Sequence, residues 1–462
     1  MRISQEIILG IGGVKTLKAL GIEPDVWHMN EGHSVFLGLE RIRNKVKEQG
    51  INFYEALEAV RSNTIFTTHT PVPAGNDAFP LTLKDKFFQK YWQEVGINRH
   101  NFMDLGLQVQ PEGYEIFSLT ILAFKLSGRA NGVSELHGKV SRHIWKRMWP
   151  FIPEEEIPII HITNGIHTFS WLSKEMSALY DKYLSKDWKD YITHPEIWEK
   201  VEEIPDKDMW DTRLKIKEKM FKYLSHKLKS QCRRNEEHPK MIKCYEDIFS
   251  TKALVIGFAR RFATYKRATL IFENKERLLK LLSDPDRPVY LVFAGKAHPA
   301  DEPGQALIKE IYDISRSPEF FGKVFFIEDY NIKLAKKLVH GVDVWLNTPR
   351  RPLEASGTSG QKVPVNGGLN LSILDGWWCE GYNGENGWAI GTEEENIGHE
   401  QQDRIDRESL YDILEYEVIP AFFERDENGL PQKWIKLMKN SIKSVIPKFS
   451  TDRMVKDYAD KL

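Results

Sequence analysis

One lysine, Lys362, stands in a run of glycine, serine and threonine, in the sequence EASGTSGQKVPVNGGLN. Because Gly357 and Gly360 lack side chains, the backbone before the lysine can approach an anion closely. Successive N–H groups that lead into a helix suit a phosphate, and Thr358 and Ser359 add hydroxyl donors. A lysine beside such a site suggests a Schiff base with a phosphorylated aldehyde, which indicates pyridoxal phosphate. An ordinary glycine-rich turn is the plainer alternative.

A cluster of positively charged residues follows an apolar stretch in the second half of the chain. The apolar residues 254–258, LVIGF, predict a buried strand, and four cations follow within eight residues: Arg260, Arg261, Lys266 and Arg267. A charge run usually marks a solvated surface. At the carboxyl edge of a parallel sheet, however, the loops after strands form ligand sites. We therefore expect an anion site here.

Polar residues also stand at strand ends and turns in the first part of the chain. His33 follows the strand-like stretch 25–28, and Asn164 lies in a Thr-Asn-Gly-Ile turn after the strand-like stretch 157–161. His137 lies where a turn leads into a helix. The strand-end positions favour ligand binding. The alternatives are histidines packed in the core and a common Asn-Gly turn.

We expect no metal site. His69 and Asp77 lie in and after the strand-like stretch 63–70, but no third ligand stands at a useful spacing. The cysteines are too widely spaced for a disulfide framework or a zinc pattern. They are Cys232, Cys244 and Cys379.

Length and charge set broad limits. The 462 residues are enough for about two or three domains with substantial cores. Lysine plus arginine (65) nearly cancels aspartate plus glutamate (66), so no broad charge favours nucleic acid or an anionic membrane as a partner. We see neither a signal peptide nor an apolar run that could span a bilayer, and we expect a cytoplasmic location.

Strand-like and helix-like stretches alternate, which predicts an α/β fold. Residues 4–20 show helical apolar spacing, with glycines that allow close helix packing, and residues 115–127 also look helical. The strands expected in the second half are 254–258, 289–299, 323–330 and 343–349, in a parallel, doubly wound arrangement. The expected domains are 1–171, an N-terminal α/β domain; 172–250, a helical connector; 251–407, a Rossmann-like domain for cofactor and phosphate; and 408–462, helices that pack back across the domains.

Taken together and in this order, the motifs resemble those of the α-glucan phosphorylases of archaeal and bacterial type, which act on glycogen, starch or maltodextrin. The matching segments are Asn30–His33, the 67–79 loop, Gly132–His137, Thr163–Ile166, Arg260–Arg267, Gly295–Ala297, Asp329–Tyr330 and Glu354–Asn370. The resemblance implies a glycosyltransferase B-type architecture, in which two Rossmann-like domains face a cleft, with the N-terminal domain incomplete here. It also implies a pyridoxal-phosphate-dependent hexosyltransferase of carbohydrate metabolism. Such an enzyme moves a terminal glucosyl unit of an α-1,4-glucan onto inorganic phosphate, giving α-D-glucose 1-phosphate with retention.

The resemblance also implies roles for single residues. The catalytic set would be His33, Arg261, Lys266 and Lys362. The cofactor would be held by Lys362, Arg260, Gly357, Thr358, Ser359 and Tyr330. The sugar would be held by His33, His137, Asn164, Glu354, Ala355, Ser356 and Gly357.

The chain departs from the family pattern in places. Arg260 stands where the family has a lysine, Gly360-Gln361 replaces an asparagine-methionine pair, and Glu31-Gly32 replaces aspartate-threonine. The family also has a large block ahead of the segment that resembles residues 4–20. We therefore expect an uncovered apolar face there and a homo-oligomer, or else a separate chain that supplies the block. The residues of this face are Ile7, Ile8, Ile11, Val14, Leu17 and Leu20.

Two other functions fit part of the pattern. A sugar-nucleotide-dependent glucosyltransferase of the same architecture would use Arg261, Lys266 and Glu354, but it would not need Lys362. A truncated glucan-binding protein without turnover would need none of the catalytic roles. Bound cofactor and turnover with glucan and phosphate distinguish these possibilities.

Overall fold

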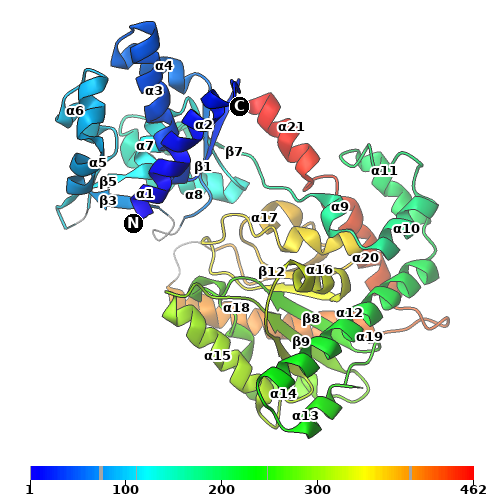
Figure 1. Cartoon of the computed structure of the whole chain (residues 1–462). Helices are drawn as coiled ribbons and strands as arrows, with labels where there is room; N and C mark the ends of the chain where they lie inside the picture. Colours follow the sequence, from blue (N-terminus) through cyan, green and yellow to red (C-terminus); the bar gives the residue numbers. More distant parts are fainter. Residues whose placement is uncertain (1, 72–75, 111, 247, 395–397) are drawn as a thin grey trace. The chain divides into compact units, whose positions relative to one another are not determined.

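The computed structural model describes residues 2–71, 76–110, 112–246, 248–394 and 398–462 (Figure 1). The chain forms two compact units. The first unit comprises Met1–Thr163 together with Asp457–Leu462, and the second comprises Asn164–Lys456. Among the described residues, no helix combines the length and apolar character needed to cross a membrane.

A six-stranded parallel sheet forms the centre of the second unit. Its strands are β8 (Leu254–Ala259), β9 (Val289–Ala294), β10 (Val324–Ile327), β11 (Val344–Asn347), β12 (Leu369–Ile373) and β13 (Gly387–Ile390). They lie in the order β10-β9-β8-β11-β12-β13, with every pairing parallel. The order runs outward in both directions from β8 and β11, so the topology reverses between these two strands. The predicted parallel α/β arrangement is confirmed.

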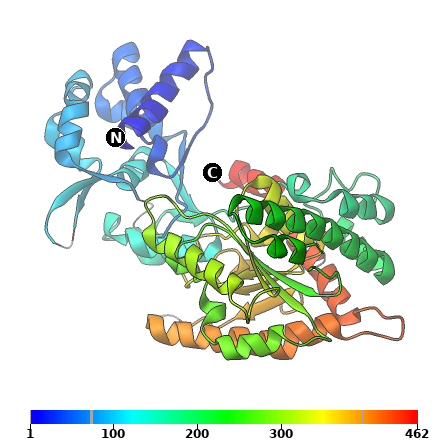
Figure 2. The same cartoon turned by 60° about the horizontal axis from the view of Figure 1, so that its bottom comes forward.

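Helices cover both faces of this sheet (Figures 1 and 2). Alternate residues of β8 point into different cores: Ile256 packs with helices on one face, and Val255 packs with helices on the other. The first face carries α14 (Lys275–Leu282), α15 (Glu302–Arg316), α18 (His399–Ile413) and α20 (Gln432–Val445). The second carries α12 (Asp206–Arg234) and α16 (Ile332–Gly341).

Capping side chains and a proline mark the residues at which two of these helices begin. Asp301 accepts the N–H of Gly304 at the start of α15 at 3.0 Å, and a proline stands in its first turn. Asn331 accepts the N–H groups of Lys333 and Leu334 at the start of α16. Such caps satisfy helix N–H groups that would otherwise lack partners.

The stretch 172–250 is largely helical and belongs to the second unit. Besides α12, it holds α10 (Lys174–Tyr183), α11 (Pro195–Glu199) and α13 (Pro239–Cys244). Short helices α9 (Thr168–Trp171), α17 (Trp378–Gly381) and α19 (Ile419–Phe423) complete the unit.

A four-stranded parallel sheet forms the centre of the first unit. Its strands, in the order β1-β2-β6-β7, are β1 (Trp27–Asn30), β2 (Thr64–Thr67), β6 (Arg129–Gly132) and β7 (Ile159–His161). A smaller antiparallel sheet contains β3 (Ala78–Pro80), β5 (Glu115–Ser118) and β4 (Leu107–Val109). The helices are α1 (Arg2–Ile7), α2 (Gly13–Ala19), α3 (Phe36–Gln49), α4 (Phe53–Arg61), α5 (Leu81–Glu94), α6 (Arg99–Asp104), α7 (Leu119–Leu126) and α8 (Glu135–Trp145).

The helix predicted over 115–127 is wrong in its first turn. Residues 115–118 form β5, the central strand of the antiparallel sheet, and α7 begins only at Leu119. Ser118 ends the strand and caps the helix, because its hydroxyl accepts the N–H of Ile121. Short apolar runs suit either state, and here the pairing of β5 with β3 and β4 decides it.

The N-terminal helix runs through α1, a π-helical turn (Ile8–Gly12) and α2. An added Cβ at Gly10 would lie 2.7 Å from the backbone nitrogen of Leu37, so this glycine allows α3 to pack closely, as predicted. The residues of the expected apolar face differ in their exposure to solvent. Val14 is buried, whereas Ile8 and Leu20 are 72% and 67% exposed.

The last helix, α21 (Thr451–Lys461), ends in the first unit. The Tyr458 hydroxyl lies 3.1 Å from the Thr67 hydroxyl and accepts a hydrogen bond from the Asn131 amide at 3.1 Å. The Tyr458 ring also packs against His28, with centroids 4.9 Å apart. Residues from the end of the chain therefore complete the surroundings of β1, β2 and β6.

Candidate functional site

Charged groups converge at the carboxyl ends of β8 and β11, where the topology of the large sheet reverses. Arg260 follows β8 directly and donates from Nη1 to Oδ1 of Asn347, the last residue of β11, at 2.9 Å. Its Nη2 donates to the carboxylate of Glu354. Lys266 Nζ lies 3.4 Å from the same Glu354 oxygen. Arg260 and Lys266 are buried, so the predicted anion site holds two enclosed cations around one carboxylate.

The loop after β9 supports Arg260 from the next strand. An added Cβ at Gly295 would lie 2.0 Å from the carbonyl oxygen of Arg260. The backbone carbonyl of Lys296 in turn accepts a hydrogen bond from the backbone N–H of Phe262 at 2.9 Å. The Gly295–Ala297 motif therefore acts by letting two loops approach closely at the sheet edge.

Burial and neighbouring charges shift the pKa values of Lys266 and Glu354. Burial and the nearby positive charge of Arg260 lower the pKa of Lys266 to about 7. Burial alone would raise the pKa of Glu354, but the charges of Arg260 and Lys266 outweigh it and hold this pKa below its ordinary value. An anion entering here would meet one permanent cation and one lysine whose protonation it would favour.

Lys362 ends a 3-10 turn, Gly360–Lys362, in the loop between β11 and β12. Its Nζ lies 4.1 Å from the ring centre of Trp171. Within the described ranges, no acidic side chain forms an ion pair with this lysine. Burial lowers the pKa of Lys362. A partly buried lysine with a depressed pKa suits nucleophilic chemistry at its amine.

Tight local geometry shapes the loop that carries Lys362. Gly357 has φ +79°, and a Cβ at Gly360 would lie 2.7 Å from Oδ1 of Asn370. The Asn370 amide donates to the Gly360 carbonyl at 3.0 Å. Gln361 donates from Nε2 to the carbonyl of Asn164 at 2.9 Å, which brings the predicted Thr-Asn-Gly-Ile turn to this loop.

Several buried polar atoms around the loop lack a hydrogen-bond partner among the described residues. Such atoms are costly unless a ligand or water satisfies them. They are Arg260 Nε, Ser356 Oγ, Gln361 Oε1 and Asn370 Oδ1. Arg260 Nε and Ser356 Oγ can donate to an anionic group such as the phosphate of pyridoxal phosphate, whereas the amide oxygens of Gln361 and Asn370 can only accept, from a donor group of a ligand or from water.

Other residues of the predicted cation run have different surroundings. Arg267 is buried and does not join the anion site. It donates to Asp403 at 2.7 Å and Asp406 at 2.6 Å on α18, and to backbone carbonyls after β11. Arg261 is exposed, and Tyr330 reaches the carbonyl of Ala259 at 3.4 Å. Of the four cations in this run, Arg267 therefore joins a separate ion-pair cluster with α18.

In the first unit, His33 lies beside Asp77, with Nδ1 and Oδ2 3.1 Å apart. Arg2 Nη2 donates to the same Asp77 oxygen at 2.9 Å. Glu6 lies behind them, and burial together with the charge of Asp77 raises its pKa to about 8. The ligand atoms of Glu6, His33 and Asp77 lie within 4.8 Å of one another, but Arg2 already places a positive charge there.

His137 is buried near the start of α8, and its Nδ1 accepts the N–H of Val133 at 3.2 Å. Burial lowers the pKa of His137 to about 3, so the ring stays neutral. Its predicted contact with sugar stays a prediction, as do the assigned roles of His33 and Asn164. Sequence reasoning did not single out Asn347 or Trp171, because neither stands in a pattern that signals ligand binding.

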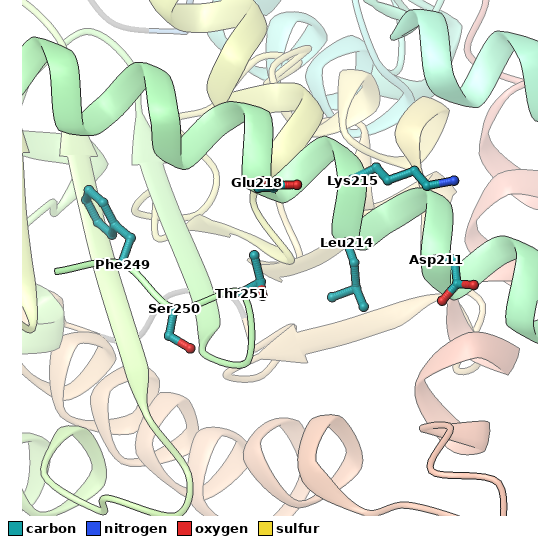
Figure 3. Close-up of a pocket in the computed structure, with 7 residues that line it drawn as sticks. All are labelled: Asp211, Leu214, Lys215, Glu218, Phe249, Ser250 and Thr251. Atoms are coloured by element: carbon teal, nitrogen blue, oxygen red, sulfur yellow. The ribbon is translucent and has the colours of Figure 1, made fainter. Parts of the chain in front are cut away.

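A surface hollow lies at the opposite, amino-terminal end of the large sheet. It is lined by Asp211, Leu214, Lys215, Glu218, Phe249, Ser250 and Thr251 (Figure 3). Leu214 extends from α12 toward the loop that precedes β8. Because ligands of such sheets bind at the carboxyl ends of the strands, we assign the site to the Arg260–Glu354 cluster.

Comparison with known proteins agrees with the resemblance seen in the motifs. The carbohydrate phosphorylase family matches residues 22–415. The chain is 48% identical to a maltodextrin phosphorylase of Thermococcus litoralis over 460 residues, which cover 100% of this chain and 53% of that protein. It is 40% identical to a glycogen phosphorylase of Aquifex aeolicus, covering 100% of this chain and 66% of the relative. A Mycobacterium bovis glycogen phosphorylase is 39% identical over 99% of this chain and 54% of its own length. The chain thus spans about half to two thirds of these relatives.

Proposed function

The chain belongs to the carbohydrate phosphorylase family, and we propose that it is an α-1,4-glucan phosphorylase. It would transfer a terminal glucosyl unit to inorganic phosphate and release α-D-glucose 1-phosphate with retention. The observation that carries this proposal is the convergence of Arg260, Lys266 and Glu354 at the topological reversal, in the same unit as Lys362. The named relatives support the substrate class, because they are maltodextrin and glycogen phosphorylases.

In this proposal, the enclosed cations bind the substrate phosphate. Lys266 supplies a buried ammonium and Arg261 an exposed guanidinium beside it. Arg260 presents a forked donor set suited to a cofactor phosphate, and it is already oriented by Asn347. Enclosed charges act strongly on an anion because little water screens them.

Lys362 would anchor pyridoxal phosphate, with Gly357, Thr358, Ser359 and Tyr330 around it. When bound, this cofactor supplies a phosphate that exchanges a proton with the substrate phosphate. The residues of the chain hold the lysine amine near Trp171 and enclose the anion site. The four unsatisfied buried atoms around the loop support a polar ligand there.

Sugar-binding roles are proposed for polar groups of each unit separately. In the second unit these are Glu354, Asn164 and the Ala355-Ser356-Gly357 turn. In the first unit they are His33 and His137. Hydroxyl contacts of this kind orient the glucosyl group and strengthen as positive charge develops on it.

The partners would be an α-1,4-glucan, inorganic phosphate and a second copy of the chain. The exposure of Ile8 and Leu20 supports self-association, because covering exposed apolar side chains is favourable.

The decisive test is a phosphorolysis assay on the purified chain reconstituted with pyridoxal phosphate. We expect glucose 1-phosphate from maltodextrin and phosphate, and none without cofactor. A chain that binds no cofactor but transfers glucose from a sugar nucleotide would instead support the glucosyltransferase alternative.

A further inference from the structure

A buried aspartate outside the predicted motifs holds the backbone of the anion site. Asp375 lies just after β12 and is 3% exposed. Its Oδ2 accepts the backbone N–H of Glu354 at 2.9 Å, and its Oδ1 accepts the backbone N–H of Gly376 at 2.8 Å. One carboxylate therefore joins two turns that are far apart in the sequence.

Two more features hold the same turns together. The N–H of Trp377 donates to the carbonyl of Ser356 at 2.8 Å. Gly376 has φ +54°, and a Cβ there would lie 2.5 Å from the Ser356 oxygen and 2.8 Å from the Glu354 oxygen. The glycine thus permits a contact that no other residue could make without moving the turn.

The chemistry at Glu354 depends on this support. The Glu354 side chain contacts Arg260 and Lys266, whereas its backbone N–H is held by Asp375. Burial raises the pKa of Asp375 to about 8, and the Glu354 charge adds to this, while the backbone N–H bonds and Arg351 act in the opposite direction. The backbone hydrogen bond therefore holds two acidic residues close to one another.

We infer that Asp375 is a positioning residue, which holds the Glu354 carboxylate on Arg260 and Lys266 during the reaction proposed above. This inference rests on the proposed function. Asp375 would not touch the substrate; it acts through Glu354. Asparagine at this position offers only one acceptor, so one of the two backbone N–H groups would face an amide N–H instead.

Amide hydrogen exchange tests the support without requiring activity. In the Asp375→Asn variant we expect exchange at the backbone of Glu354 and Gly376 to be about tenfold faster. The matched control is Asp426→Asn, because Asp426 also accepts two backbone N–H groups, from Asn428 and Leu430, in a separate surface turn. Unchanged protection of Glu354 in the Asp375 variant would overturn the inference.

A double-mutant cycle tests the coupling to catalysis. Asp375→Asn alone is expected to lower kcat about ten- to a hundredfold, with a smaller change in the KM for glucan. In a Glu354→Gln background the same change should cost less than about threefold, because the group that it positions is already altered. Equal losses in both backgrounds would show a merely structural role.

The outcomes also separate this inference from the proposed function. The Asp375→Asn variant can show the expected faster amide exchange while the unmodified chain shows no turnover. That result would contradict the phosphorylase proposal and leave Asp375 without a positioning role in catalysis. Asp375→Ser, which keeps one acceptor, serves as a second variant where the asparagine variant does not fold. If neither variant folds, Asp375 is structural and the inference fails.

Discussion

Lys266 is a cation in surroundings that disfavour its charge. Its pKa of about 7 reflects burial first and the neighbouring Arg260 second. The ammonium is therefore fully charged only below this pKa and loses its proton as the pH rises through it.

Anion affinity should accordingly fall as the pH rises from about 6 to 8. Sulfate is the suitable probe, because it does not titrate in this range, and calorimetry can measure its binding. Lys266→Arg, which keeps the charge, should remove most of this pH dependence, whereas Lys266→Ala should weaken binding about 10- to 150-fold. A pH dependence that persists in Lys266→Arg would show that another group is responsible.

Lys362 should be the residue that forms an imine with pyridoxal phosphate. Its amine lies against Trp171, and burial lowers its pKa. Borohydride reduction followed by peptide mass analysis should place the adduct on Lys362. Lys266, whose pKa is also lowered, is the internal control, and an adduct there would contradict the assignment.

At the scale of elements, Arg267 shows how one side chain joins distant segments. It links the loop after β11 to α18 through Asp403 and Asp406, and its own backbone is left-handed at φ +43°. Burial raises the pKa of Asp406, so this acid depends on the arginine for its charge. Arg267 thus contributes to the fold at the edge of the anion site.

Arg267→Met should lower the free energy of unfolding by about 3 to 5 kcal/mol, because it leaves the buried Asp406 without its arginine, whereas the more exposed Asp403 keeps Arg350. Arg277→Met is the matched control. Arg277 also pairs with acids of the α18 region, but on the surface, where such pairs contribute about 0 to 1 kcal/mol. Chemical denaturation measures both, and equal losses would show that burial of the Arg267 cluster does not matter.

Sequence reasoning found the elements whose residues are uniformly apolar. Strands β8 to β11 consist of buried residues, and continuous apolar runs are typical of strands in a parallel sheet. Strand β6, with the sequence RANG, carries no such signal, and it is a strand because its neighbours in the sheet supply partners. The same reasoning explains why β12, which contains Asn370 and Ser372, was not predicted.

The candidate site was predictable to a similar degree. Lys362, Arg260, Lys266 and Glu354 stand in motifs, and the structure groups the last three of them in direct contact. Asp375 was not predictable, because its role depends on a backbone N–H that lies twenty-one positions away in the sequence. The burial of Arg267 depends in the same way on α18.

At the scale of the whole molecule, the N-terminal helix leaves apolar side chains in water. Ile8 and Leu20 are 72% and 67% exposed. Covering such groups is favourable by about 25 cal/mol per Å² of apolar area. A second copy of the chain would supply this cover in the proposed assembly.

Light scattering of the purified chain should therefore show a homo-oligomer, and the double variant Ile8→Lys with Leu20→Lys should shift it toward monomer. Phe151→Ser is the control, because Phe151 is 97% exposed in the same unit but lies outside this helix. A monomeric unmodified chain, or equal effects of both changes, would contradict the assembly.

The return of α21 to the first unit also bears on how the chain is made. Tyr458 completes the hydrogen bonding of Thr67 and Asn131, yet it is translated more than three hundred residues after them. The second unit is contiguous from Asn164 to Lys456, whereas the first is interrupted by it. Domains tend to fold in order as they leave the ribosome. Here residues 1–163 are synthesised before residues 457–462, so the sheet of the first unit lacks the Tyr458 hydrogen bonds until that last segment has been made.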